Sequence, residues 1–510
     1  MLNVKVTQKN KIILFLLLIL LNAIIRIPSI HHEKGNDSFL IHILSNSITT
    51  FGEANWLTNF PSIFGLYPAS YASGLPFILS GISQITNIEM EITILLFSVV
   101  LGLLSLYTSY LLGGIIYNNF IFKFIFSLFF SLSQGVLIFT TWEISSRGLF
   151  IVLFPLHIYL LIKCLNKFDI RIIILILINT ALLFTTHNFA YFAVYLFGFM
   201  IFYSLFKNKV KLSHKISIIL YTILFLIFSL LPFLKRTLIV SGSKYSWMIT
   251  TAVIETRFVG PLIILLIGGI SYLVLKYPKK IEESFILFCS IALIPIIYSQ
   301  IYGHYVWLIF SIFFISISFR NIIVTKQKYN KIFAILLIIF FVAFSSFYNH
   351  WRTGQNSRDW YMDDETFSSG IWAKEYINDT VSGIGNSDVT VRRFLAISDG
   401  HPNILSEDVV ANTYGLINVS QMSLIQNSPL SMNFYFDGPY VLEPGQSIDG
   451  KINWIIQQQE IDGRTSHEIL RNYNVDYFIM DTNNPTPIFN SLKNKMLIYD
   501  NKRIQIFIIN

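Results

Sequence analysis

The chain has 510 residues, of which 54% are hydrophobic, 16% aromatic and 13% charged. Soluble globular proteins carry roughly 25% charged residues, so this composition, with a mean hydropathy of +0.59, excludes a string of soluble domains and indicates a polytopic membrane protein. Residues 1–350 contain 25 Lys and Arg against 10 Asp and Glu, whereas residues 351–510 contain 12 against 19, for a net charge of +8. The positive charge lies between apolar segments rather than on one face, which argues against nucleic-acid binding.

The apolar runs predict an α-helical membrane domain over residues 1–349. Eleven runs have spanning length, at about 12–30, 90–116, 120–140, 148–166, 170–186, 188–206, 216–234, 259–275, 284–300, 303–319 and 332–348. The expected fold is therefore polytopic, with about 11 transmembrane helices. The first run has a basic N-terminal flank and no small-residue cleavage site, so we expect an uncleaved anchor.

Basic residues set the expected orientation. With the N-terminus in the cytoplasm, 18 basic residues of the membrane domain lie inside and 7 outside, as the positive-inside rule requires. A further span at 71–88 would invert every later loop, so we expect this stretch to be a helix in or dipping into the outer leaflet. The prediction is a multi-pass cell-membrane protein with a large external loop at 31–89 and an extracytoplasmic tail.

The tail, residues 350–510, predicts a small extracytoplasmic α/β domain. Strands are expected at Val389–Ile397 and Val475–Met480, and a capped helix is expected near Thr465. The last residues, from Leu497 to Ile508, predict a hairpin. The charged stretch Arg358–Glu365 is expected to link this domain to the last span.

Asp37 is the first candidate for chemistry. It lies just beyond the first span and precedes an amphipathic stretch in which Phe39, Ile43 and Ile48 share one face. Acids at a membrane surface are costly and often functional, and this carboxylate could accept a proton from a hydroxyl or bind a divalent cation. The alternative is that Asp37 or Ser38 only caps the following helix.

The second external turn gathers several polar groups. Residues 141–148 contain Trp142, Glu143, two serines and Arg147 between two long apolar runs. Such a turn suits a binding site. The alternative is an interfacial tryptophan accompanied by an arginine that snorkels to the membrane surface.

Arginine is concentrated on the predicted external side. Four of the 7 external basic residues are arginines, namely Arg26, Arg147, Arg236 and Arg257. A guanidinium binds phosphate in a bidentate manner, so these side chains would suit a lipid-linked phosphate. His187 and His304 occupy further external turns, where a structural interfacial role is the alternative.

These residues resemble the first external loop of GT-C membrane glycosyltransferases, most closely prokaryotic relatives of oligosaccharyltransferase catalytic subunits. The resemblance is carried by Arg26-Ile27-Pro28, Gly35–Phe39, Gly52, Trp56, Asn59-Phe60-Pro61 and Gly65-Leu66-Tyr67-Pro68. The Trp142–Gly148 turn is similar to the second external loop of the family. The resemblance covers about residues 20–200; later segments match only in architecture.

The resemblance implies a transferase that uses a polyprenyl-phosphate-linked sugar donor in the lipid bilayer and a glycan, lipid or protein acceptor. It implies inverting transfer with Asp37 as the base, and a divalent cation (Mg or Mn) held by Asp37 and Glu143. The residues then expected to bind substrate are Tyr67, Trp142, Arg147, His187, Arg236 and His304. Glu143 is a single acid, which departs from the acidic pair of the family's metal motif. The tail lacks the Trp-Trp-Asp signature, so protein glycosylation is kept only as the alternative.

Two other classes of protein are left open. A transporter of lipid-linked sugars would place polar residues within its spans, whereas polarity here collects at one surface. A non-catalytic scaffold for envelope assembly would use Asp37 only as a helix cap. Convergence of Asp37, Glu143 and Arg147 on one cavity would favour the enzyme.

Overall fold

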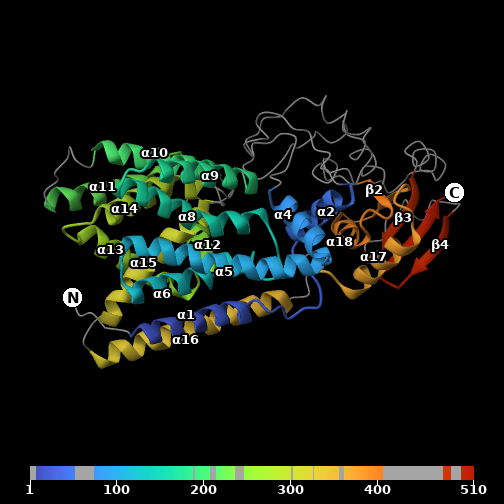
Figure 1. The fold of residues 1–510 in the computed structure, drawn as a ribbon, viewed down its shortest axis with the longest axis horizontal. Helices are drawn as coiled ribbons and strands as arrows, with labels where there is room; N and C mark the ends of the chain where they lie inside the picture. Colours follow the sequence, from blue (N-terminus) through green and yellow to red (C-terminus); the bar gives the residue numbers. More distant parts are fainter. Residues whose placement is uncertain are drawn as a thin grey trace.

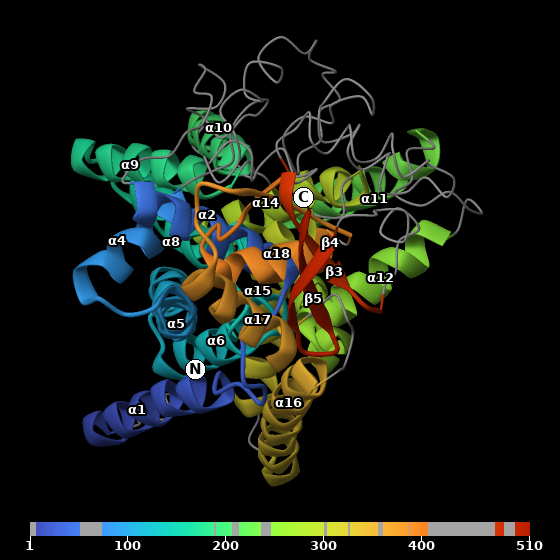
Figure 2. The same cartoon turned by 90° about the vertical axis from the view of Figure 1, so that its right-hand side faces the viewer.

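The computed structural model describes residues 7–51, 74–187, 190–206, 214–235, 246–299, 303–324, 327–354, 361–386, 388–405, 475–483 and 495–509. Figure 1 shows a long bundle of helices with the N-terminus at one end and a small domain of helices and strands at the other. In Figure 2 this small domain faces the viewer and lies over the end of the bundle.

The bundle consists of helices, most of which coincide with predicted apolar runs. In chain order they are α1 (Gln8–Ile25), α2 (Asn36–Phe51), α4 (Gly74–Thr86), α5 (Met90–Ile116), α6 (Phe120–Ser131), α7 (Gln134–Leu137), α8 (Ser146–Asn166), α9 (Ile170–Thr186), α10 (Ala190–Phe206), α11 (His214–Lys235), α12 (Ser246–Val259), η1 (Pro261–Leu265), α13 (Leu266–Leu275), α14 (Ile281–Ser299), α15 (Gly303–Val324) and α16 (Lys328–Gly354). Helices α8 and α15 are largely buried and form the centre, whereas α1 and α16 lie at the outside.

Fewer of these helices are full spans than the sequence predicts. Each predicted run overlaps at least one described helix, but only five described helices are long and apolar enough to cross a membrane, or six if one bent pair counts as a span. The bent pair is α12 with η1–α13, which meet at 113°. The bend follows from Gly260, with φ of +87°, and from Pro261 at the start of η1. The structure therefore shows a multi-pass membrane domain that also contains shorter apolar helices.

A second break concerns the predicted run at 120–140. Helix α6 ends at Ser131, and the short α7 ends at Leu137. Residues 140–145, which follow, are neither helix nor strand. These residues are buried. The stretch at 71–88, expected to form a helix at the outer leaflet, contains α4, which packs against α2.

The domain at the far end combines α17 (Asp364–Tyr376) and α18 (Asp388–Ser398) with a five-stranded sheet. Its strands, β1 (Ser382–Gly385), β2 (Asn403–Leu405), β3 (Val475–Asp481), β4 (Lys495–Asp500) and β5 (Ile504–Ile509), lie in the order β2-β1-β3-β5-β4. Strands β1, β2 and β3 are parallel, whereas β5 is antiparallel to β3 and β4. The predicted strand at Val475–Met480 and the predicted C-terminal hairpin are confirmed.

Two sequence predictions for this domain are wrong. Val389–Ile397 forms helix α18 rather than a strand, because Val391, Phe394 and Leu395 follow helical spacing and are buried. The predicted linker extends too far, since α17 begins at Asp364 with Asp363 as its N-cap. The helix expected near Thr465 lies outside the described residues.

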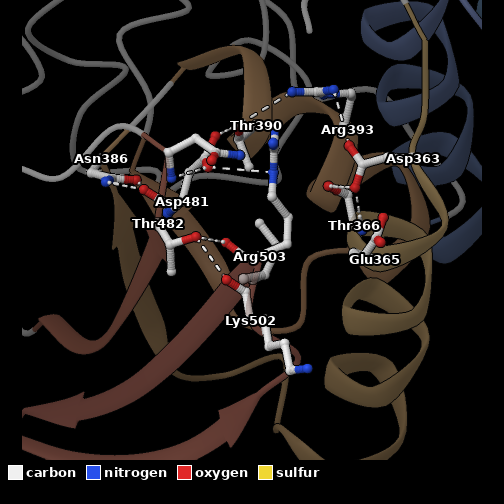
Figure 3. A network of polar contacts seen from close by, with 12 residues as sticks. Asp363, Glu365, Thr366, Asn386, Thr390, Arg393, Asp481, Thr482, Lys502 and Arg503 are labelled. Atoms are coloured by element: carbon white, nitrogen blue, oxygen red, sulfur yellow. Dashed lines mark hydrogen bonds and ion pairs between the residues drawn. The ribbon is translucent and has the colours of Figure 1, made fainter. Parts of the chain in front are cut away.

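Figure 3 shows a polar network that joins the helices and strands of this domain. Asp481 of β3 is buried and accepts a hydrogen bond from Thr390 Oγ1 of α18 at 2.7 Å. Its other carboxylate oxygen lies 3.4 Å from Nε of Arg503, which precedes β5. Arg393 of α18 lies 3.2 Å from the carboxylate of Asp363. The network therefore connects α17, α18, β3 and β5.

Helix α2 connects the bundle to the small domain. Phe39 and Ile43, which the sequence places on one apolar face, are fully buried in the same hydrophobic cluster as Phe394 and Leu395 of α18. Asn46 Nδ2 of α2 also donates to the carbonyl of Ala396 at 3.0 Å. The apolar face of α2 is thus covered by the small domain.

Candidate active site

The loop after α1 delivers Asp37 to the first turn of α2. Gly35 has φ of +97°, and its carbonyl accepts hydrogen bonds from the backbone N–H groups of Ser38 and Phe39 at 2.9 and 3.1 Å. Gly35 therefore turns the chain into the helix. The Asp37 side chain points to the second loop, and this contact goes beyond the helix-capping alternative considered from the sequence.

The second loop pairs with the first through backbone contacts. The N–H of Lys34 donates to the carbonyl of Trp142 at 3.2 Å, and the N–H of Ile144 donates to Ser38 Oγ at 2.9 Å. Trp142 is buried, and its indole N–H donates to the carbonyl of Glu91 at 3.3 Å. Trp142 therefore fixes the loop to α5 and is not an exposed interfacial side chain.

Asp37 and Arg147 form the ion pair at the centre of the site. Asp37 Oδ2 lies 3.1 Å from Arg147 Nη1, and the two side chains are 38% and 20% exposed. The Ser145 hydroxyl donates to the same carboxylate oxygen at 3.2 Å and accepts from the N–H of Arg147 at 3.3 Å. Ser145 is the N-cap of α8, so one hydroxyl orients both charged residues. Asp37 retains a solvent-accessible surface that a substrate can reach.

Glu143 takes part in a different pair. It is buried, and its carboxylate lies 3.7 Å from Nζ of Lys34, which is also buried. The backbone of Gly35 packs directly against the Glu143 side chain. Sequence reasoning missed Lys34, because nothing in its local pattern distinguishes it from a solvated loop lysine.

The two carboxylates expected to bind a divalent cation are both matched by positive charges. Asp37 faces Arg147 and Glu143 faces Lys34, so a cation would have to displace both side chains. Among the described residues no group of three or more His, Cys, Asp and Glu side chains could hold a metal ion. As they stand, these residues do not fit a metal.

His187 lies close to this centre. It is the C-cap of α9 and is buried. Burial lowers the pKa of His187 well below its ordinary value, and the positive charge of Arg147 lowers it further. The imidazole of His187 is therefore expected to be neutral. The structure thus brings Asp37, Arg147, Ser145 and His187 to one end of the bundle.

No family model matches this sequence, and no curated protein does. Solved structures, by contrast, match its fold. The oligosaccharyltransferase of Archaeoglobus fulgidus is 12% identical and superimposes with a TM-score of 0.60 over 99% of this chain and 74% of that chain. ArnT from Cupriavidus metallidurans, solved with undecaprenyl phosphate, is 9% identical, with a TM-score of 0.52 over 99% of each chain. The arabinofuranosyltransferase AftD from Mycobacteria is 11% identical, with a TM-score of 0.54 over 99% of this chain and 42% of that one.

The chain has the GT-C fold. The similarity covers nearly its whole length, so the expected likeness to GT-C enzymes is confirmed at the level of the fold. Within this GT-C fold, the two loops that the sequence singled out, at Gly35–Phe39 and Trp142–Gly148, lie in contact with one another. The fold therefore assembles the site from parts of the chain more than 100 residues apart.

Arg26 has a structural role in this GT-C fold. It is fully buried, and its guanidinium donates to Thr140 Oγ1, to the carbonyl of Ser131, and to both the carbonyl and Oδ1 of Asn22, at 2.9–3.0 Å. Its side chain lies against the backbone of Gly102. Arg26 therefore does not have the accessible position expected of a phosphate-binding residue, because its donors are used inside the bundle.

His304 belongs to a second buried polar pair of the GT-C bundle. Its Nδ1 lies 2.7 Å from the Glu255 carboxylate of α12, and the Ser311 hydroxyl donates to the same carboxylate at 3.4 Å. The polar contact of His304, a residue of α15, is thus with α12, whereas Asp37 contacts Arg147 of α8. Tyr67 and Arg236 lie outside the described residues.

A further pair that the sequence did not single out supports the first loop. His42 of α2 is buried, and its Nδ1 lies 2.6 Å from the Glu33 carboxylate. The backbone N–H of Glu33 donates to Glu91 Oε1 at 2.9 Å. The one available signal was the presence of a histidine within an otherwise apolar stretch of α2.

Proposed function

We propose that this protein is a GT-C glycosyltransferase that transfers a sugar from a polyprenyl-phosphate-linked donor to the hydroxyl of an acceptor. One observation carries this proposal: a partly exposed carboxylate, Asp37, is oriented by Arg147 and Ser145 at the end of a membrane domain with the GT-C fold. Proteins that share this fold bind undecaprenyl phosphate or dolichol phosphate, which supports a lipid-linked donor.

In the proposed reaction Asp37 is the general base. As the acceptor oxygen forms its bond to the anomeric carbon, Asp37 takes the proton of that hydroxyl. The bond from the anomeric carbon to the phosphate oxygen breaks, and polyprenyl phosphate leaves with the bonding electron pair. Attack from the face opposite the phosphate inverts the anomeric configuration.

The leaving phosphate requires positive charge close to the site. In the described part of the chain we assign this role to Arg147, whose guanidinium also holds the Asp37 carboxylate. A guanidinium keeps its charge at any working pH, so Arg147 can supply this positive charge throughout the reaction. Arg236 and Tyr67, which the sequence indicates as substrate-binding residues, are also proposed to contact the substrate. A divalent cation is likewise a prediction of the resemblance, and the assay below tests it.

We place the site on the extracytoplasmic side, with the N-terminus in the cytoplasm, because basic residues then concentrate inside. Helix α4 is the proposed wall of the groove for the donor lipid. Its first residue, Gly74, packs against Thr185 of α9, where a Cβ atom would lie 2.8 Å from Thr185 Oγ1. This contact sets α4 beside the end of α9 that carries His187.

The test is a transfer assay in proteoliposomes with a panel of polyprenyl-phosphate sugars and with glycan, lipid and peptide acceptors, each with Mg²⁺, Mn²⁺ or EDTA. We expect Asp37→Asn to lower the rate by about 10²–10⁴-fold without changing expression or the melting temperature. Asp500→Asn removes an acid of the β4–β5 hairpin and is the matched control. Wild-type rates for Asp37→Asn would refute the assignment, and transfer only to peptides would favour an oligosaccharyltransferase-like activity.

A further inference from the structure

A cavity lies at the end of the bundle that faces away from the small domain, where Figure 1 places the N-terminus. Its volume is about 420 Å³, and it is lined by α1, the end of α5 and the start of α6. Asp37 lies at the other end, where α2 meets α18. The cavity is therefore separate from the proposed transfer site.

Two lysines give this cavity its charge. Lys11 is in the first turn of α1 and Lys123 is in the first turn of α6, and the lining contains no acidic residue. Positive charge at a helix N-terminus opposes the helix dipole, so neither lysine is placed to stabilise its own helix. Together they create a concentrated positive potential within one cavity.

An aromatic ring lies near each of the two ammonium groups, and a glycine accommodates the stem of Lys123. Lys123 Nζ lies 5.0 Å from the centroid of the Tyr110 ring, and Lys11 Nζ lies 6.0 Å from that of Phe120. The stem of Lys123 passes over Gly114 of α5, where a Cβ atom would lie 3.1 Å from Lys123 Cδ. Both lysines are half-buried, so they are positioned at the cavity rather than extended into solvent.

The rest of the lining is suited to a lipid. Gln8 and Asn118 add polar groups near the lysines, whereas Ile12, Phe15 and Leu16 add apolar surface along α1. Ile12 and Leu16 are 53% and 58% exposed, so this surface is open to acyl chains. A free anion would use the lysines but not this apolar strip, whereas a phospholipid would use both.

We propose that this cavity binds one anionic phospholipid from the leaflet at the N-terminal end, with its phosphate between Lys11 and Lys123 and an acyl chain along α1. Basic pockets between membrane helices are suited to such head groups. In the topology proposed above this is the cytoplasmic leaflet. The inference does not rest on the proposed enzymatic function, since it concerns the opposite end of the bundle.

The test is native mass spectrometry of the purified full chain, released from micelles that contain phosphatidylglycerol or phosphatidylcholine. We expect the wild type to retain phosphatidylglycerol preferentially and the Lys11→Gln/Lys123→Gln variant to retain about tenfold less of it. Lys9→Gln/Lys163→Gln removes the same charge from exposed positions outside the cavity and is expected to behave as the wild type. Lys11→Arg/Lys123→Arg keeps the charge and is expected to keep most of the binding.

Three results would overturn the proposal. The first is equal retention of phosphatidylglycerol by the wild type and the glutamine variant, with both folded by thermal melting. The second is equal retention of the two lipids by the wild type. The third is displacement of phosphatidylglycerol by millimolar inorganic phosphate, which would identify a free-anion site. If the double variant does not fold, Lys11→Gln alone is expected to lower retention, and unchanged retention would refute the proposal.

Discussion

Gly35 and Glu143 are in direct contact across the two loops of the site. A Cβ atom at Gly35 would lie 2.6 Å from Cγ and 3.1 Å from Oε1 of Glu143, and Gly35 has φ of +97°. A side chain at this position would therefore both strain the backbone and push Glu143 away from Lys34. Because Gly35 leads directly into α2, this contact also determines where Asp37 lies.

Replacing Gly35 should damage the site and the fold together. We expect Gly35→Ala to reduce the free energy of unfolding by about 1–3 kcal/mol and to lower the transfer rate, as measured by thermal melting in detergent and by the transfer assay. Gly81→Ala, within α4, is the control, because a Cβ there meets nothing within 4 Å. Equal melting temperatures for the two variants would contradict this account.

Gly102 should be intolerant of any side chain. A Cβ atom there would overlap the Arg26 guanidinium, and displacing that buried cation would break its hydrogen bonds to Asn22 and Thr140. We expect Gly102→Ala to cost about 3–5 kcal/mol of stability, seen as loss of the monodisperse peak in size-exclusion chromatography. Gly198→Ala in α10, where a Cβ meets nothing within 4 Å, should remain monodisperse.

The stability of the first loop should depend on pH through His42. Burial opposes the charged form, but the Glu33 carboxylate at 2.6 Å, assisted by Asp399 and Glu91, raises the pKa of His42 above 6.5. The charged ring therefore stabilises the fold below an unfolded-state pKa of about 6.5, and this contribution disappears as pH rises through the higher folded-state value.

Melting curves from about pH 6 to about pH 9 test this dependence. The difference in melting temperature between the wild type and His42→Gln should be largest at the acidic end and should shrink as pH rises. His31→Gln, which changes a side chain that is 86% exposed, is the control. A difference that grows with pH would mean that His42 is neutral in the folded protein.

Ser145 should affect turnover more than substrate binding. Its hydroxyl contacts both the Asp37 carboxylate and the N–H of Arg147, so its loss would leave the base less well oriented. We expect Ser145→Ala to lower kcat about tenfold with little change in KM, and Ser145→Thr to restore most of the rate. Ser368→Ala, at an exposed position of α17, is the control. A change confined to KM would show that Ser145 binds substrate instead.

The membrane helices and the C-terminal hairpin could be predicted because their signals are local. Apolar runs are helical wherever backbone groups must be satisfied without water, and Asp500-Asn501-Lys502 separates two alternating apolar stretches. The strand predicted at Val389–Ile397 failed for the opposite reason. Its β-branched residues favour a strand, but burial of Val391, Phe394 and Leu395 in the cluster shared with α2 favours a helix.

The candidate site could be predicted only in part. Asp37 and Arg147 each follow the end of an apolar segment, so a common membrane surface brings them together. The partner of Glu143, however, depends on how the two loops cross, and the partner of Glu33 depends on how the first loop folds back on α2. Lys34 and His42 reach those acids through tertiary packing alone, and no spacing in the sequence encodes it. The burial of Arg26 depends in the same way on Gly102.

Helix α2 carries Asp37 in its first turn and presents Phe39 and Ile43 to the small domain. The proposed base and the apolar surface that packs against the small domain therefore lie on the same helix. A chimera that combined this bundle with a foreign exterior module would expose those two side chains and misplace the carboxylate. The small domain should consequently be exchangeable only if the replaced segment includes α2. A displacement of the small domain should also move the proposed base.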